Sequence, residues 1–106
     1  MPDNRQHPRK PIHPTASWSL PGGPRNTSHC RDISLGGCFL ETATPPAFGA
    51  AVIVFLELPG LRDDAGAPTV AAVSSTVRWT TPTGMGVQFG PMGVRETHCL
   101  IAALGH

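Results

Sequence analysis

Two short patterns in the chain place side chains that could bind a phosphorylated purine. Arg5 and Arg9 stand four residues apart near the start of the chain, and Asp32, Ser34 and Gly37 follow at D-x-S-x-x-G spacing. Guanidinium groups match phosphate oxygens and the acceptor edge of guanine. A carboxylate can accept from a guanine N–H, a hydroxyl can reach phosphate, and glycine lets a backbone approach a ligand closely. The two patterns together predict a pocket for a guanine-containing phosphodiester.

Two further basic residues are secondary candidates for this pocket. Lys10 follows the arginine pair directly, and Arg31 directly precedes Asp32. Each pattern alone also has a simpler interpretation. Arginines on a polar segment are commonly solvated surface charges, and an Asp-x-Ser pattern before Gly-Gly is typical of a turn held by side chain-to-backbone hydrogen bonds.

The bulk composition limits both fold and function. The 106 residues are enough for one domain with one modest core. Gly and Pro number 12 each, and the prolines interrupt helices along most of the chain. A net charge of +1 with 14% charged residues is unlike a DNA- or RNA-binding protein, which needs a basic face. Two or three local arginines would still suffice for a small anionic ligand.

Cysteine usage and hydropathy indicate a cellular compartment. Three cysteines, an odd number, do not suggest a disulfide framework and fit a reducing compartment. The sequence has neither a signal-peptide apolar core nor an apolar run of 18 residues. We therefore expect a soluble cytoplasmic protein without membrane insertion.

The pattern of apolar residues predicts mostly strands. Residues 1–14 hold four prolines and are expected to form an extended, mobile leader, followed by a domain over residues 15–106. Alternating or continuous apolar runs then predict strands, and Pro-Gly-rich stretches, including Pro59-Gly60, predict turns between them. The expected strands cover residues 15–20, 28–33, 38–41, 51–58, 69–79 and 85–89.

Only the C-terminus has helical spacing. Val94, Thr97, Ile101 and Leu104, with Leu100 beside them, form an apolar face that is expected to pack on the strands, and Gly105 is a plausible C-cap. A chain of about six strands and one helix hides its strand edges best as a small barrel, with the helix covering one opening. The predicted fold class is therefore all-β.

Other chemistries find less support. His29-Cys30, Cys38 and His98-Cys99 lack the C-x-x-C or H-x-x-H spacing of zinc sites, so these cysteines are expected to be small buried residues. No nucleophile–base set can be assigned, and we expect neither an enzyme nor a metal or cofactor. Trp18 and Trp79 share the apolar parity of their strands and are predicted to lie in the core rather than to stack on bases.

Five motifs in one order resemble the PilZ domain, a bacterial receptor module for cyclic di-GMP. Two of them are the arginine pair and the D-x-S-x-x-G pattern described above. The other three resemble the family's turn after its central strand, its V-x-W strand and its G-x-G-V-x-F strand: Leu58-Pro59-Gly60, Val77-Arg78-Trp79 and Gly84-Met85-Gly86-Val87-Gln88-Phe89. The resemblance extends from Arg5 to Leu104. One departure is Asn4, where many members carry another basic residue.

The resemblance implies a small six-stranded antiparallel β-barrel with a C-terminal helix and a flexible N-terminal leader. It also implies binding without turnover: the leader closes over cyclic di-GMP, and another, unidentified effector protein reads the closed form. The ligand residues that it implies are Arg5, Arg9, Asp32, Ser34 and Gly37. Because 106 residues leave no room for an output domain, we expect the output to lie in that partner.

The sequence alone leaves two rival functions open. The first is a PilZ-like protein-interaction module that does not bind nucleotide, for example in type IV pilus or motility machinery. The second is a barrel that binds single-stranded nucleic acid, which would need exposed aromatic residues and a basic groove. The arginine pair argues against the first rival, and the low charge argues against the second.

Overall fold

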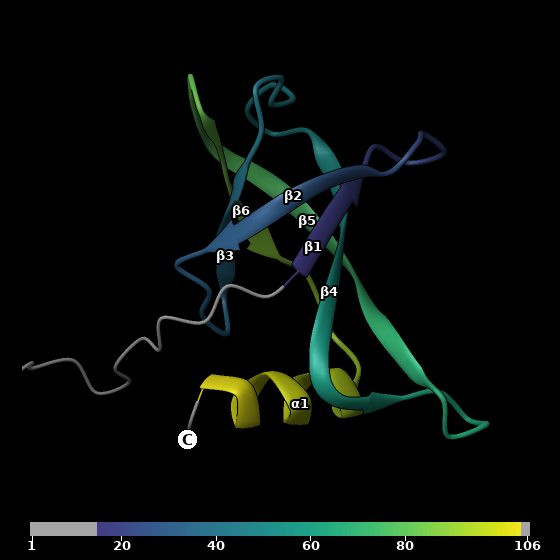
Figure 1. The fold of residues 1–106 in the computed structure, drawn as a ribbon. Helices are drawn as coiled ribbons and strands as arrows, with labels where there is room; N and C mark the ends of the chain where they lie inside the picture. Colours follow the sequence, from purple (N-terminus) through teal and green to yellow (C-terminus); the bar gives the residue numbers. More distant parts are fainter. Residues whose placement is uncertain (1–14, 105–106) are drawn as a thin grey trace, which may run out of the picture.

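The computed structural model describes residues 15–104, which form six strands and one helix (Figure 1). The expected leader and the expected C-cap at Gly105 lie outside the described residues. The elements are β1 (Thr15–Ser19), β2 (Asn26–Arg31), β3 (Gly37–Glu41), β4 (Ala51–Arg62), β5 (Pro68–Thr81), β6 (Gly84–Phe89) and α1 (Val94–Leu104).

The strands close into a barrel in the order β1-β2-β3-β6-β5-β4, and every neighbouring pair is antiparallel. The predicted all-β barrel with a C-terminal helix is thus confirmed. Alternation along the strands explains the closure, because one face of each strand supplies the core and the other faces solvent. In β5, for example, Ala71, Val73 and Val77 are buried, whereas Ala72 and Ser74 are exposed.

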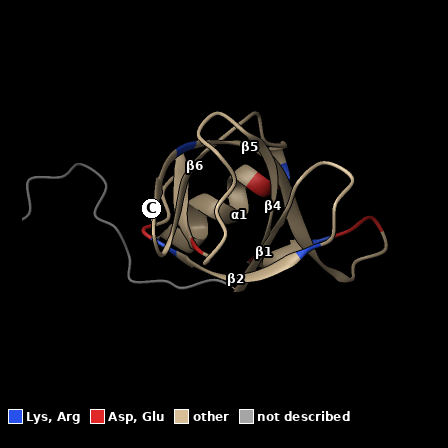
Figure 2. Ribbon diagram, turned by 90° about the horizontal axis from the view of Figure 1, so that it is seen from above, with Lys and Arg blue, Asp and Glu red and all other residues tan. Residues whose placement is uncertain are grey.

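Helix α1 covers one opening of the barrel, as Figure 2 shows in a view along the barrel. Its Leu100 and Leu104 are buried, and α1 packs mainly on β4. Val94 departs from the expected face, since it is 73% exposed in the first turn of the helix. The helix is therefore fixed to the barrel by its C-terminal half.

Strand β4 runs past the turn that the sequence predicted at Pro59-Gly60. Its pairing with β5 shifts register between Glu57 and Arg62, and Gly60 takes a left-handed φ of 82° within the shifted segment. This irregularity lets the strand bend toward α1, where Leu58 and Leu61 become buried. The predicted turn is wrong because glycine's freedom is used here for a bend inside a continuing strand.

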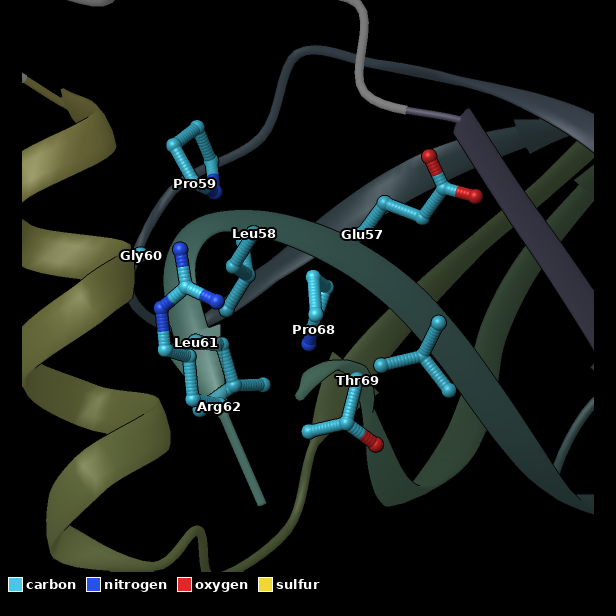
Figure 3. Close-up of a pocket in the computed structure, with 9 residues that line it drawn as sticks. Glu57, Leu58, Pro59, Gly60, Leu61, Arg62, Pro68 and Thr69 are labelled. Carbon is cyan, nitrogen blue, oxygen red and sulfur yellow. The ribbon is translucent and has the colours of Figure 1, made fainter. Parts of the chain in front are cut away.

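The bend in β4 leaves a hollow of about 500 Å³ between β4 and the start of β5 (Figure 3). It is lined by residues 57–62 of β4 and 68–70 of β5, and none of the predicted ligand residues that the structure describes is among them. We interpret this hollow as a by-product of the bend that buries Leu58 and Leu61.

The first strand is shorter than expected. β1 ends at Ser19, and Leu20 is 45% exposed because its carbonyl accepts a hydrogen bond from the Gly23 N–H at 2.8 Å, which closes the following turn. Leu20 therefore belongs to the turn and not to the core. The barrel end that carries this turn is opposite to α1 (Figure 1).

Candidate functional site

The D-x-S-x-x-G pattern forms the loop between β2 and β3. Asp32 takes a left-handed φ of 51°, the single positive φ among non-glycine residues 15–104, and this ends β2 at Arg31. Aspartate tolerates this conformation better than most residues. Ile33 then turns inward and is 1% exposed, so it anchors the loop in the core. Asp32 and Ser34, on either side of this anchor, remain on the outer side.

Ser34 organises the rest of the loop. Its N–H donates to the Gly37 carbonyl at 2.9 Å, and its Oγ accepts from the Gly36 N–H at 3.2 Å. The Gly36 carbonyl accepts in turn from the Phe89 N–H of β6 at 2.8 Å. The turn interpretation of this motif is therefore correct, and it is compatible with a binding role because the bonds hold the loop in one shape.

Gly37 is needed for close packing of two strands. It pairs with Gln88 of β6, and a Cβ at this position would overlap the carbonyl oxygen of Val87. Its φ is not positive, so glycine is not required here as a left-handed residue. Asp32 has that role, and Gly37 supplies the close approach of β3 to β6.

Trp79 lies on the outside of the barrel, contrary to the prediction that it belongs to the core. Its side chain is 53% exposed, whereas Trp18 is 4% exposed and lies in the core as predicted. The pairing of β5 with β6 shifts between Val77 and Trp79, where Arg78 is an extra residue. Such a bulge reverses the inward–outward alternation for the residues that follow it.

A glycine on the neighbouring strand makes room for the displaced indole. Trp79 pairs with Gly86, and a Cβ on Gly86 would overlap the indole ring. The ring thus lies against the bare backbone of β6. Glycine inside a strand often marks such a close approach, so the G-x-G pattern at 84–86 was a signal in the sequence that could have placed Trp79 outside.

The loop, the bulge and β6 together enclose a cavity of about 450 Å³ on the outer face of β3, β6 and β5. It brings together three of the predicted ligand residues, Asp32, Ser34 and Gly37. It also includes residues that the sequence analysis did not select for the site. These are Gly36, Cys38, Phe39, Arg78, Trp79, Val87 and Gln88.

Of the predicted basic residues, the structure describes Arg31 alone. Arg31 does not line the cavity: its guanidinium lies over the Phe39 ring, 4.9 Å from the centroid, and its Nε is 3.1 Å from a carboxylate oxygen of Glu41. Arg5, Arg9 and Lys10 lie outside the described residues. Among the residues that line the cavity, Arg78 is the cation, and its Nε donates to Oε1 of Gln88 at 2.6 Å.

The start of β1 lies at the same end of the barrel as the loop. Thr15 pairs with His29 of β2, three residues before Asp32. Arg9 is six positions before Thr15 in the sequence, and six extended residues span at most about 20 Å. Thr15, the first described residue, thus starts β1 at the barrel end that carries the Asp32–Gly37 loop.

A pair of thiols lies on the inner side of this loop. Cys30 and Cys38 are buried at its two ends, and the three cysteines of the chain are free. A hydrogen bond between the two thiols, together with burial, raises the pKa of Cys38 above its ordinary value. The Cys38 thiol is therefore held neutral behind the cavity.

The raised pKa of Cys38 predicts that the protein loses stability at alkaline pH. Because the pKa of Cys38 is raised in the folded state, its contribution is complete below the unfolded thiol's pKa of 9.0 and falls as the pH rises above it. We expect the free energy of unfolding to decrease by up to about 1.4 kcal/mol per pH unit there. Urea denaturation of the wild type and of Cys38→Ala between pH 8 and 10.5 measures it, because comparing the two slopes removes the contribution of the groups that both proteins share, including the other two thiols. Equal slopes for the wild type and Cys38→Ala would contradict the assignment.

No three His, Cys, Asp or Glu side chains of residues 15–104 are arranged to hold a metal ion. A helix with the length and apolar character needed to cross a bilayer is also lacking from this region.

Comparison with known proteins identifies the family. The sequence profile of the PilZ domain matches residues 3–105. The chain belongs to the PilZ family. PilZ is a family of cyclic di-GMP-binding domains, which act in binding and as adaptors rather than in catalysis. No curated protein sequence matches this PilZ chain.

Solved structures share the fold of this PilZ domain. The Bacillus subtilis inhibitor of motility (MotI/DgrA) has a TM-score of 0.68 at 15% identity, over 96% of this chain and 49% of its own. MrkH of K. pneumonia in its apo state has a TM-score of 0.60 at 17% identity, over 98% of this chain and 50% of its own. The PilZ chain thus spans about half the length of these proteins, and at such identities the likeness concerns the fold.

Proposed function

We propose that this PilZ domain is a cyclic di-GMP receptor that signals to a partner protein. The observation that carries the proposal is the cavity in which Asp32, Ser34 and Gly37 meet the exposed face of Trp79. Cyclic di-GMP presents two guanines and two phosphodiesters. The cavity offers an aromatic face for a base, a carboxylate for guanine N–H groups and a hydroxyl for a phosphate or base.

The leader of residues 1–14, called the N-terminal arm from here on, carries the positive charge that the barrel lacks. Residues 15–104 hold five arginines and six acidic residues, and Figure 2 shows these charges at scattered positions around the barrel. Arg5, Arg9 and Lys10 precede β1, which starts at the end of the barrel where the loop lies. We infer that the arm folds onto the cavity and that Arg5 and Arg9 bind the phosphates or the guanine edge.

The energies favour closure of the arm only with ligand bound. Fixing the backbone of one residue costs about 1–2 kcal/mol, so ordering five to ten residues is costly without compensation. Each charge-assisted hydrogen bond contributes roughly 1.5–3 kcal/mol, and several of them can offset that cost. The closed arm then presents a surface that the ligand-free protein does not, and a partner can recognise it.

A titration with three nucleotides tests this function. We expect cyclic di-GMP to bind with measurable heat and to change tryptophan emission, because Trp79 lines the cavity and Trp18 is buried. Cyclic di-AMP should bind at least about tenfold more weakly, since one good guanine contact discriminates by roughly 1–3 kcal/mol. GMP should also bind more weakly, because it presents one base and one phosphate where cyclic di-GMP presents two of each. Isothermal titration calorimetry with parallel fluorescence measures both.

Two variants locate the fluorescence signal. Trp18→Phe should keep the emission change, and Trp79→Phe should lose it while the heat of binding remains. If cyclic di-GMP gave neither heat nor an emission change, the receptor proposal would be wrong. The protein would then be better described by the alternative, an interaction module of the PilZ family without nucleotide binding.

A further inference from the structure

Arg78 is the residue that the bulge of β5 adds to the cavity. Val77 pairs with Val87 and Trp79 pairs with Gly86, so Arg78 has no partner of its own on β6. Its side chain is exposed and lines the cavity beside Trp79. The bulge therefore presents a guanidinium and an indole from consecutive residues to the same cavity.

Gln88 holds this guanidinium in place. The bond from Arg78 Nε to Gln88 Oε1 is 2.6 Å long, and Gln88 itself pairs with Gly37 of the loop. A guanidinium is a rigid planar fork, so a bond at Nε orients the whole group and leaves its two terminal nitrogens as a pair of parallel donors. Arg78 is thus tied through Gln88 to the strand that follows the Asp32–Gly37 loop.

An exposed arginine on a strand often serves only to keep the surface solvated. Three features distinguish Arg78 from Arg25, which is also exposed: the short bond to Gln88, the adjacent Trp79 in the sequence and the position in the cavity lining. Arg25 lies instead over the ring of Phe55, 3.7 Å from the centroid and outside the cavity. Arg25 therefore serves as a matched control of the same charge.

We propose that Arg78 binds the O6/N7 edge of a guanine that lies against Trp79, and that Gln88 positions it. This inference rests on the proposed function. A pair of parallel guanidinium donors matches the two acceptors of guanine, whereas adenine presents an N–H donor at the position of O6. Arg78 is then a specificity-determining residue that selects guanine over adenine, in addition to the arginines of the N-terminal arm.

The experiment compares Arg78→Ala, Gln88→Ala, the double variant and Arg25→Ala. Affinities for cyclic di-GMP are measured by calorimetry, and those for cyclic di-AMP by competition. We expect Arg78→Ala to weaken cyclic di-GMP binding about 10- to 100-fold and to leave cyclic di-AMP binding within about twofold. Gln88→Ala should weaken cyclic di-GMP binding several-fold in the wild-type background and have no further effect when Arg78 is already alanine.

Each outcome decides for or against the inference. A loss for Arg78→Ala no larger than that for Arg25→Ala would overturn it. Equal losses for cyclic di-GMP and cyclic di-AMP would assign Arg78 to a phosphate and refute guanine selection. An undiminished effect of Gln88→Ala in the Arg78→Ala background would refute the positioning role. If the wild type bound no cyclic di-GMP, both the proposed function and this inference would be wrong. The other outcomes contradict this inference alone.

Discussion

Replacing Arg9 by alanine is expected to weaken cyclic di-GMP binding by about 2–5 kcal/mol, the usual effect of removing one partner of a close charge pair. The reason is that the residues lining the cavity include one cation, Arg78, and one carboxylate, Asp32. The two phosphodiesters of the ligand would therefore depend on the N-terminal arm for most of their neutralisation. Calorimetry on the wild type and the variant measures the difference.

A second arginine variant separates this effect from a general change in charge. Arg95→Ala removes the same charge from α1, where Arg95 pairs with Asp64 at 2.9 Å and lies outside the cavity. It should change cyclic di-GMP affinity by less than about 0.5 kcal/mol, as most surface substitutions do. Unchanged affinity in Arg9→Ala would remove Arg9 from the site, and equal losses in both variants would point to long-range electrostatics.

Replacing Gly37 by alanine is expected to destabilise the protein by about 2–4 kcal/mol. The added Cβ would overlap the carbonyl oxygen of Val87, and both groups belong to backbone that is paired within the barrel. β3 and β6 would have to separate, which would also disturb the cavity between them. Urea denaturation followed by circular dichroism measures the loss.

The neighbouring glycine provides a matched control. A Cβ on Gly36 would meet nothing closer than Ser34 Oγ at 4.0 Å, and Gly36 has no positive φ. Gly36→Ala should therefore be within about 0.5 kcal/mol of the wild type, because the substitution also restricts the unfolded chain. Similar losses at both positions would show that the close approach of β3 to β6 is not what requires glycine at position 37.

The local pattern of the sequence was sufficient for much of the fold. Alternation of apolar residues placed Ala16, Trp18 and Val73 in the core, and all three are buried. Helical spacing placed the C-terminal helix with Leu100 and Leu104 against the barrel. These predictions are correct because burial in a regular strand or helix depends on a period that neighbouring residues already display.

The errors fall where the backbone departs from that period. Trp79 shares the parity of Val77, and the bulge at Arg78 reverses it. Pro59-Gly60 has the composition of a turn, and β4 instead bends there and continues to Arg62. In each case a partner strand or helix distant in the sequence decides which of two local conformations is adopted.

For the candidate site, too, the sequence predicted the local motif, and the tertiary structure placed its neighbours. The residue types and spacing of Asp32, Ser34 and Gly37 were enough to select a loop with binding chemistry and to suggest its family. Only the tertiary structure placed that loop beside Arg78, Trp79 and Gln88, and it also directed Arg31 toward Glu41, away from the cavity. A motif specifies which groups are available within a few residues, whereas the pairing of β3 with β6 and the bulge in β5 determine which groups face the same cavity.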